Sequence, residues 1–240
     1  MLIGGLALAT FAAPAGAATG PTIDPAVKAN ASDTALATLQ ADGAAAIARR
    51  QTQLSTLSAK IAARPACDAG GAQAALVNHD TGALATLGDK LAADTTVATA
   101  HDDVKSILQD YRVYLVVTPQ VFSTSACGHI RAATDRLTDI QTKLTAKVDA
   151  AAAGGADMTA AQASLSDMAA KMASARNAGD AAASSLAAIG PDHGDASVLA
   201  SNQAAVASAR SQLKGARTDL TTAVTDAKSV VAALKALPAN

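Results

Sequence analysis

Alanine is the feature that most constrains how this chain can fold. It accounts for 66 of the 240 residues, and it has the highest intrinsic helix propensity of any residue. The chain is 50% hydrophobic but only 2% aromatic, so its apolar content consists mostly of methyl groups. A composition of this kind is typical of long helices. The sequence therefore predicts an all-α protein and excludes a β-sandwich or barrel.

Turn residues divide the chain into six helical stretches. Gly154-Gly155 and the stretch 190–195 are rich in helix breakers, and Pro119 is placed as prolines often are at a helix start. Because the connections are short, we expect neighbouring helices to run antiparallel. The expected helices span 25–63, 71–93, 96–117, 119–153, 159–189 and 196–237.

Seven-residue repeats predict how these helices pack. The last helix carries one row from Leu199 to Leu234 and a second, mostly alanine, from Asn202 to Leu237. This spacing is typical of a coiled-coil seam whose small residues allow close approach. The fifth helix has matching rows, so we expect these two helices to pack along their length. Its rows are Met158, Leu165, Met172, Gly179 and Leu186, and Ala161, Met168, Ala175, Ala182 and Ile189.

The first and fourth helices show the same kind of apolar repeat. Their rows are Leu36, Gly43, Ile47, Leu54, Leu57 and Ile61, and Ile130, Leu137, Ile140, Leu144 and Val148. The second and third helices are shorter and should thicken one end. We therefore expect residues 18–240 to form a single elongated antiparallel helical bundle with coiled-coil-like, alanine-rich seams.

The first residues indicate a secreted protein. Residues 2–13 form an apolar run, followed by Pro14 and the small residues Ala15-Gly16-Ala17. This pattern is typical of a secretory signal peptide, and the run is too short to span a bilayer. We expect 1–17 to be that signal, with a true start upstream of Met1 because no basic residue precedes the run. The mature chain should be extracellular or cell-wall associated, without membrane insertion; the alternative is a buried N-terminal helix.

The two cysteines are expected to form a disulfide. In a secreted chain Cys67 and Cys127 meet an oxidising environment, where pairing is the default. In the expected topology Cys67 follows the first helix, and Cys127 lies two turns inside the fourth helix at the same end. A second interpretation makes Cys127 a nucleophile beside His129. That Cys-based enzyme requires a free thiol, so the disulfide would exclude it.

Every aromatic residue after the expected signal lies between positions 110 and 122. These are Tyr111, Tyr114 and Phe122, with Arg112 among them. One interpretation is that the rings fill a core, since aromatic side chains dominate core burial. The other is a patch that binds a partner, because tyrosine and arginine are enriched at interfaces. Tyr111, Arg112, Tyr114 and Phe122 are therefore the candidate partner-binding residues.

The stretch from Asp110 to Gln120 also resembles a segment of secreted alanine-rich helical proteins of actinobacteria and other bacteria. That group has no assigned activity. The resemblance implies secretion and a helical fold, and it assigns no functional residue to this chain.

Charge and motif content narrow the function further. Nineteen Lys+Arg against 20 Asp+Glu give a net charge of −1, which removes the electrostatic drive toward nucleic acid. We find no motif for a cofactor, and His79 and His101 should lie too far apart along their helices to share a metal ion. The turn around His193 has acidic neighbours that suit a cation, but helix capping and turn formation explain them more simply. We therefore expect no nucleic acid, cofactor or metal.

Together these patterns favour a secreted, non-enzymatic structural or interaction module at or near a bacterial cell surface. Its partner would be a cell-wall component or a protein, and Arg210 and Arg217 share one stripe of the last helix that would suit an acidic polymer. The helical seams also permit a homo-oligomer. The alternative is an extracellular protein that binds a small ligand or metal in the helical head near Tyr111 and Tyr114.

Overall fold

A computed structural model describes residues 25–63, 67 and 71–237, with side chains from residue 30 onward. The expected signal peptide at 1–17 lies outside this part of the chain. The described residues are helical except for short connections and contain no strand. The elements are α1 (Pro25–Ala63), α2 (Ala72–Ala93), α3 (Val97–Gln109), the π-helical turn η1 (Val113–Val117), α4 (Thr118–Ala153), α5 (Thr159–Ala187) and α6 (Ala196–Lys235).

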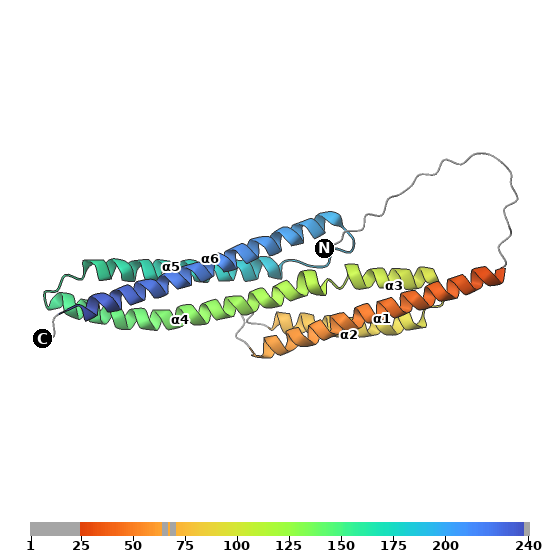
Figure 1. The fold of residues 1–240 in the computed structure, drawn as a ribbon, viewed down its shortest axis with the longest axis horizontal. Helices are drawn as coiled ribbons and strands as arrows, with labels where there is room; N and C mark the ends of the chain where they lie inside the picture. Colours follow the sequence, from red (N-terminus) through yellow and green to blue (C-terminus); the bar gives the residue numbers. More distant parts are fainter. Residues whose placement is uncertain (1–24, 64–66, 68–70, 238–240) are drawn as a thin grey trace, which may run out of the picture.

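The helices form two three-helix bundles placed end to end (Figure 1). The head bundle consists of α1, α2 and α3, and the tail bundle of α4, α5 and α6. Within each bundle consecutive helices run antiparallel, so α4 and α6 point in the same direction. The 40 residues of α6 correspond to about 60 Å of helix. The all-α, elongated bundle expected from the sequence is confirmed.

The junction between the bundles differs from the expectation. The single helix expected over 96–117 is two elements, because α3 ends at Gln109 and η1 begins at Val113. The chain does not reverse there, and α4 continues in the direction of α3 (Figure 1). The antiparallel rule therefore fails at this one connection.

Local packing explains why the chain bends at this point instead of turning back. The amides of Leu115, Val116 and Val117 all donate to the carbonyl of Arg112, at 3.1, 2.7 and 3.4 Å, which widens the helix by one residue. Three valines of η1 are buried, and this anchors the bend to the head core. Pro119 lies in the first turn of α4, a position at which proline is tolerated.

The head bundle has a core of large aliphatic side chains. Leu54 and Leu57 of α1, Leu84 of α2 and Ile107 of α3 are fully buried, and Val113 of η1 joins them. The apolar row expected in the first helix faces this core. Burial of side chains of this size supplies about 1.5–3 kcal/mol each, so the head can be stable with few residues.

The tail bundle is built on alanine. Ala175 and Ala182 of α5 and Ala209, Ala216 and Ala223 of α6 have no exposed surface. Methyl groups at these positions let the two helices approach closely along their whole length, and α5 and α6 form the most extensive helix pair of the molecule. The expected pairing of the fifth and sixth helices is therefore confirmed.

One residue of the expected core rows is not in the core. Ile140 of α4 has 44% of its surface exposed, although its neighbours in the same repeat, Leu137 and Leu144, are buried. Seven-residue spacing fixes which side of a helix is apolar, but only a neighbouring helix can cover that side. At Ile140 no such neighbour is present among the described residues.

Candidate docking groove

A long groove runs between α4 and α6 on the side of the tail bundle away from α5. Its first hollow, about 500 Å³, extends from Tyr114 to Leu213, and the second, about 410 Å³, shares Phe122, Ala126 and Leu213 with it. A third hollow of about 310 Å³ begins about one turn further along both helices, at Leu137 and Val224. The three hollows together form the α4–α6 groove.

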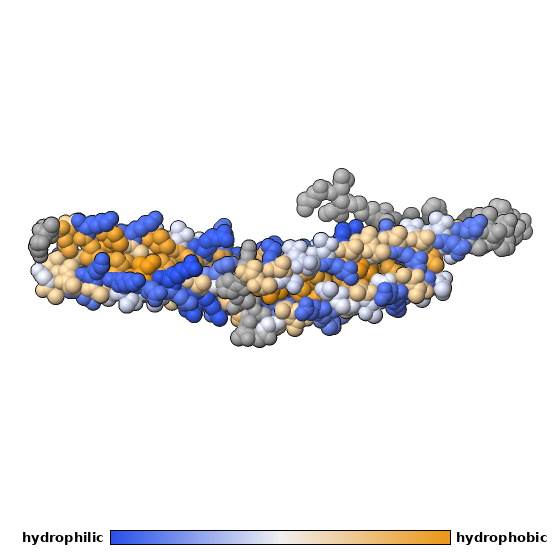
Figure 2. Space-filling model, turned by 90° about the horizontal axis from the view of Figure 1, so that it is seen from below, coloured by the Kyte–Doolittle hydropathy of each residue, from blue (hydrophilic) through white to orange (hydrophobic). Residues whose placement is uncertain are grey.

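The groove exists because the tail helices do not pack equally. The alanine seam holds α6 close to α5, and α4 packs more extensively on α5 than on α6. Branched side chains consequently remain open to solvent, with exposed fractions of 44% for Ile140, 38% for Val224 and 37% for Val231. Figure 2 shows apolar surface gathered over the end of the molecule that the tail bundle forms, with hydrophilic residues beside it.

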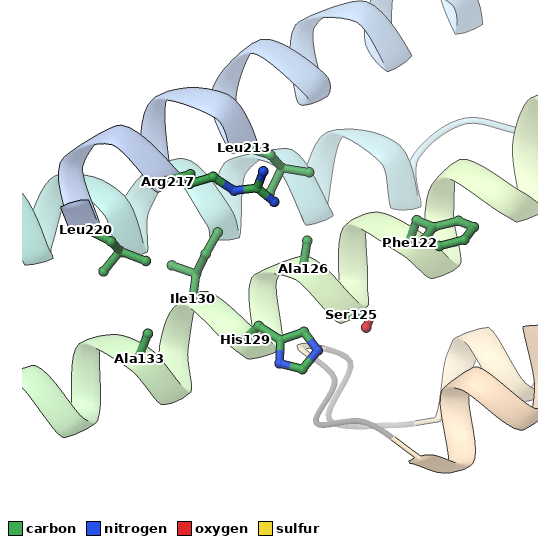
Figure 3. A pocket seen from close by; sticks show the side chains of 9 residues that line it. All are labelled: Phe122, Ser125, Ala126, His129, Ile130, Ala133, Leu213, Arg217 and Leu220. Atoms are coloured by element: carbon green, nitrogen blue, oxygen red, sulfur yellow. The ribbon is translucent and has the colours of Figure 1, made fainter.

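The middle of the groove has aliphatic walls from both helices (Figure 3). Leu213 and Leu220 of α6 face Ala126 and Ile130 of α4, and Arg217 reaches into the space between the helices. Side chains that line the groove recur every three or four residues on each helix, the spacing of one helical face.

The charge that borders the groove is of one sign. Arg210, Arg217 and Lys228 line it from α6. None of the lining residues in the described chain is acidic, and these three cations make no ion pair with a described residue. The groove therefore carries an uncompensated positive border.

Two acidic residues of the same helices contact α5 and do not line the groove. Asp135 of α4 accepts a hydrogen bond from Arg176 at 2.9 Å, and Asp219 of α6 lies 3.7 Å from Lys171. Both cations belong to α5. These two carboxylates are thus engaged by cations of α5, whereas the cations that line the groove have no such partner among the described residues.

Two of the four candidate partner-binding residues line this groove. Tyr114 and Phe122 are about half exposed, and each has one ring face against a cation of α1. The guanidinium of Arg50 lies 5.7 Å from the Tyr114 ring centre, and the Lys60 ammonium lies 4.8 Å from that of Phe122. Cation–π contacts of this length hold the rings in place at the groove's head end.

The other two candidates stabilise the junction between the bundles. Tyr111 is half-buried against the head core, and burial raises its pKa above the ordinary value. Arg112 donates to both carboxylate oxygens of Asp192, at 2.6 and 2.9 Å. Two of the four candidate residues therefore line an open surface, and the other two stabilise the fold.

Cys67 and Cys127 form the disulfide expected from the sequence, with Cα atoms 5.8 Å apart. It ties Cys67, which follows α1 in the chain, to the third turn of α4. Oδ1 of Asp180 lies 3.2 Å from Cys127 Sγ and accepts a hydrogen bond from Arg131 at 2.9 Å. These two sulfurs and Asp180 are the one group in the described chain with metal-ligand spacing, but bonded sulfurs provide no thiolate for a metal ion or for nucleophilic attack.

The acidic turn around His193 is occupied by internal contacts. Asp195 caps α6 by accepting from the amides of Ser197 and Val198, and Asp192 is held by Arg112. His193 Nδ1 lies 2.7 Å from Asp110 Oδ1. The acidic groups of this turn, which would be the ligands of a cation, are therefore already engaged in capping and ion pairing.

Sequence reasoning did not identify the groove, although part of its pattern is visible in the chain. Arg210, Arg217, Val224 and Val231 are spaced by seven and form one row of α6, next to the row that enters the seam. An apolar and basic row adjoining a complete seam indicates a second contact face. Which helix leaves that face uncovered is known only from the packing.

Comparison with protein-family models, curated proteins and solved structures finds no match to this chain. In the part of the chain that the structure describes, no helix combines the length and the apolar character needed to cross a membrane.

Proposed function

We propose that this protein is a non-enzymatic helical interaction module that acts outside the cytoplasm, at or near a bacterial cell surface, and binds its partner in the α4–α6 groove. The observation that carries the proposal is the groove itself, which combines exposed branched side chains with unpaired cations. Exposed apolar surface concentrated in one concave strip is typical of an interaction site.

Two further observations support the location and the role. A disulfide such as Cys67–Cys127 is stable in oxidising compartments and rare in reducing ones. The end-to-end bundles make a rod, and a rod can hold a partner at one end at a distance from whatever the other end contacts. Catalysis has little support in the groove, because its lining offers His129 and Ser125 but no carboxylate that would orient the imidazole as a base.

The test is the distribution of the protein between culture supernatant and washed cell wall. The groove variant Ile140→Asp/Val224→Asp places two charges on exposed positions, so folding should be kept. The control Ala173→Asp/Ala181→Asp adds the same charges at exposed positions of α5. We expect wild type and control to stay on the wall and the groove variant to be released.

A wild type that is found entirely in the supernatant, or variants that are all retained alike, would contradict the proposal. Release of the wild type by a salt wash would assign the contact to the cations Arg210, Arg217 and Lys228, because salt screens exposed charges. Circular dichroism of each purified variant checks that the helices remain intact.

The hollow next to Tyr114 favours one second candidate, a binding protein for a small apolar ligand. Its volume of about 500 Å³ falls within the usual range of ligand pockets, roughly 300–1,000 Å³, and Leu186 and Val206 give it apolar walls. Native mass spectrometry of protein purified from its source distinguishes the two functions. A stoichiometric bound small molecule that the variant Val206→Phe excludes would support this second candidate.

A further inference from the structure

We propose that the α4–α6 groove recognises an acidic amphipathic α-helix of about 25 residues that belongs to another protein. This inference rests on the proposed function and names the chemistry of the partner. The shape, the length, the floor and the charge of the groove each indicate one property of this partner helix.

The shape of the groove matches a helix. Its two walls are parallel helices, and the lining residues of each follow helical spacing, as from Val206 through Leu213 and Leu220 on α6. A groove between two parallel helices accepts the side chains of a third helix in the knobs-into-holes manner. Recognition of an amphipathic helix in an apolar groove is a recurrent mode of peptide binding.

The length of the groove sets the length of the partner. Its lining on α6 extends from Val206 to Val231, which corresponds to about 38 Å of helix. A partner helix of about 25 residues would fill it. Shorter helices would leave Ile140 and Val231 exposed at the far end.

The floor of the groove selects large side chains. Ala126 and Ala133 of α4 contribute only methyl groups to its lining. Space above an alanine is filled by a bulky residue, since well-packed interfaces alternate large and small side chains. The partner should therefore present leucine, isoleucine or phenylalanine along its apolar stripe.

The border of the groove selects the charge of the partner. Arg210, Arg217 and Lys228 are unpaired, and the acidic residues Asp135 and Asp219 are already engaged by α5. Aspartate or glutamate beside the partner's apolar stripe would pair with these cations. A second copy placed groove to groove would bring like charges together, which interfaces avoid.

The experiment uses the full chain and a panel of synthetic 25-residue peptides. Each acidic peptide has Leu, Ile or Phe at the a and d positions and Glu on both flanks. One control replaces every Glu by Lys, and another scrambles the acidic sequence. Peptide concentrations are kept where sedimentation shows monomers, and binding is measured by fluorescence anisotropy at low salt.

We expect at least one acidic peptide to bind with a micromolar Kd and to gain helicity on binding. The basic and scrambled peptides should bind at least tenfold more weakly. Failure of the whole acidic panel, or equal binding of acidic and basic peptides, would overturn the proposal.

Charge reversal tests the site. The variant Arg210→Glu/Arg217→Glu should bind the acidic peptide at least tenfold more weakly than wild type and should bind the basic peptide more tightly. The matched control Arg49→Glu/Lys105→Glu changes two exposed cations of the head bundle and should leave both affinities unchanged. Binding that survives the groove reversal would overturn the assignment of the site.

Two results separate this inference from the proposed function. If wall retention depends on the groove but no peptide binds, the module function stands and the acidic helix is wrong. If the chain dimerises in sedimentation and Ile140→Asp/Val224→Asp abolishes the dimer, the occupant is a second copy and the inference is again wrong.

Discussion

Arg112 and Asp192, 80 residues apart in the chain, form a bidentate ion pair at the junction of the two bundles. The guanidinium donates Nε–H to Oδ2 and Nη2–H to Oδ1, and the Asp192 side chain is only 1% exposed. Its Oδ1 also accepts from the amide of Gly194 at 2.8 Å. The pair thereby fixes the bend before η1 to the turn between α5 and α6.

Replacing Arg112 with alanine should destabilise the fold markedly. The change leaves a buried carboxylate without its cation, and loss of a charged hydrogen-bond partner costs about 1.5–3 kcal/mol. Urea unfolding followed by circular dichroism measures the effect. The double variant Arg112→Met/Asp192→Asn removes the stranded charge and should recover part of the loss; a double variant as unstable as the single one would show that the charge is not the cause.

Acid should weaken the same contact. The hydrogen bonds from Arg112, followed by the amide of Gly194, hold the pKa of Asp192 below its usual value. Its folded-state pKa is therefore lower than the unfolded value of about 3.9. The stabilisation is present above that value and is lost as pH falls through the folded pKa.

The measurement is urea unfolding of wild type and Asp192→Asn between pH 7 and pH 3. We expect a constant stability difference from pH 7 to about pH 5, which narrows as the pH drops below about 4. Asp33→Asn, which changes an exposed carboxylate of α1, serves as the control. A difference that stays constant to pH 3 would mean that the Arg112 contact does not depend on the Asp192 charge.

The tail seam could be predicted from sequence because its residues leave little choice of partner. Alanines such as Ala175 and Ala216 repeat every seven residues on both helices, and only a close helix–helix contact uses a surface that small. Ile140 belongs to an equally regular row, yet it is exposed. Spacing identifies the apolar side of a helix, whereas coverage of that side depends on where other helices are placed.

The junction could not be predicted for a different reason. Pro119 is compatible with the first turn of a helix that follows a reversal and equally with the first turn of a helix that continues after a bend. The choice depends on contacts distant in sequence, chiefly the Arg112–Asp192 pair and the burial of Val113. Of the candidate site residues, Tyr114 and Phe122 could be identified from the sequence because the aromatic residues cluster there. The groove that they border could not.

Loss of the disulfide should lower stability without changing the helix content. The bond closes a loop of 60 residues, which corresponds to about 4 kcal/mol if it acts by restricting the unfolded chain. Cys67→Ser/Cys127→Ser is compared with wild type in urea, each with and without a reducing agent. We expect reductant to destabilise wild type only; an effect of equal size on the double variant would exclude the disulfide as the cause.

Replacing each of two helical glycines with alanine should change the stability of the fold in opposite directions. In Gly43→Ala on α1, the new methyl group would collide with Leu91 Cδ2 and lie 3.0 Å from Val104 Cγ2. Overpacking of a filled core costs about 1–3 kcal/mol, more than the roughly 1 kcal/mol gained in helix propensity. In Gly215→Ala on α6, nothing lies within 4 Å of the new atom, so the propensity gain should raise stability. Thermal and urea unfolding of both variants measure the two changes in stability. A stabilised Gly43→Ala protein would show that α1 does not approach α2 and α3 as closely as the head bundle requires.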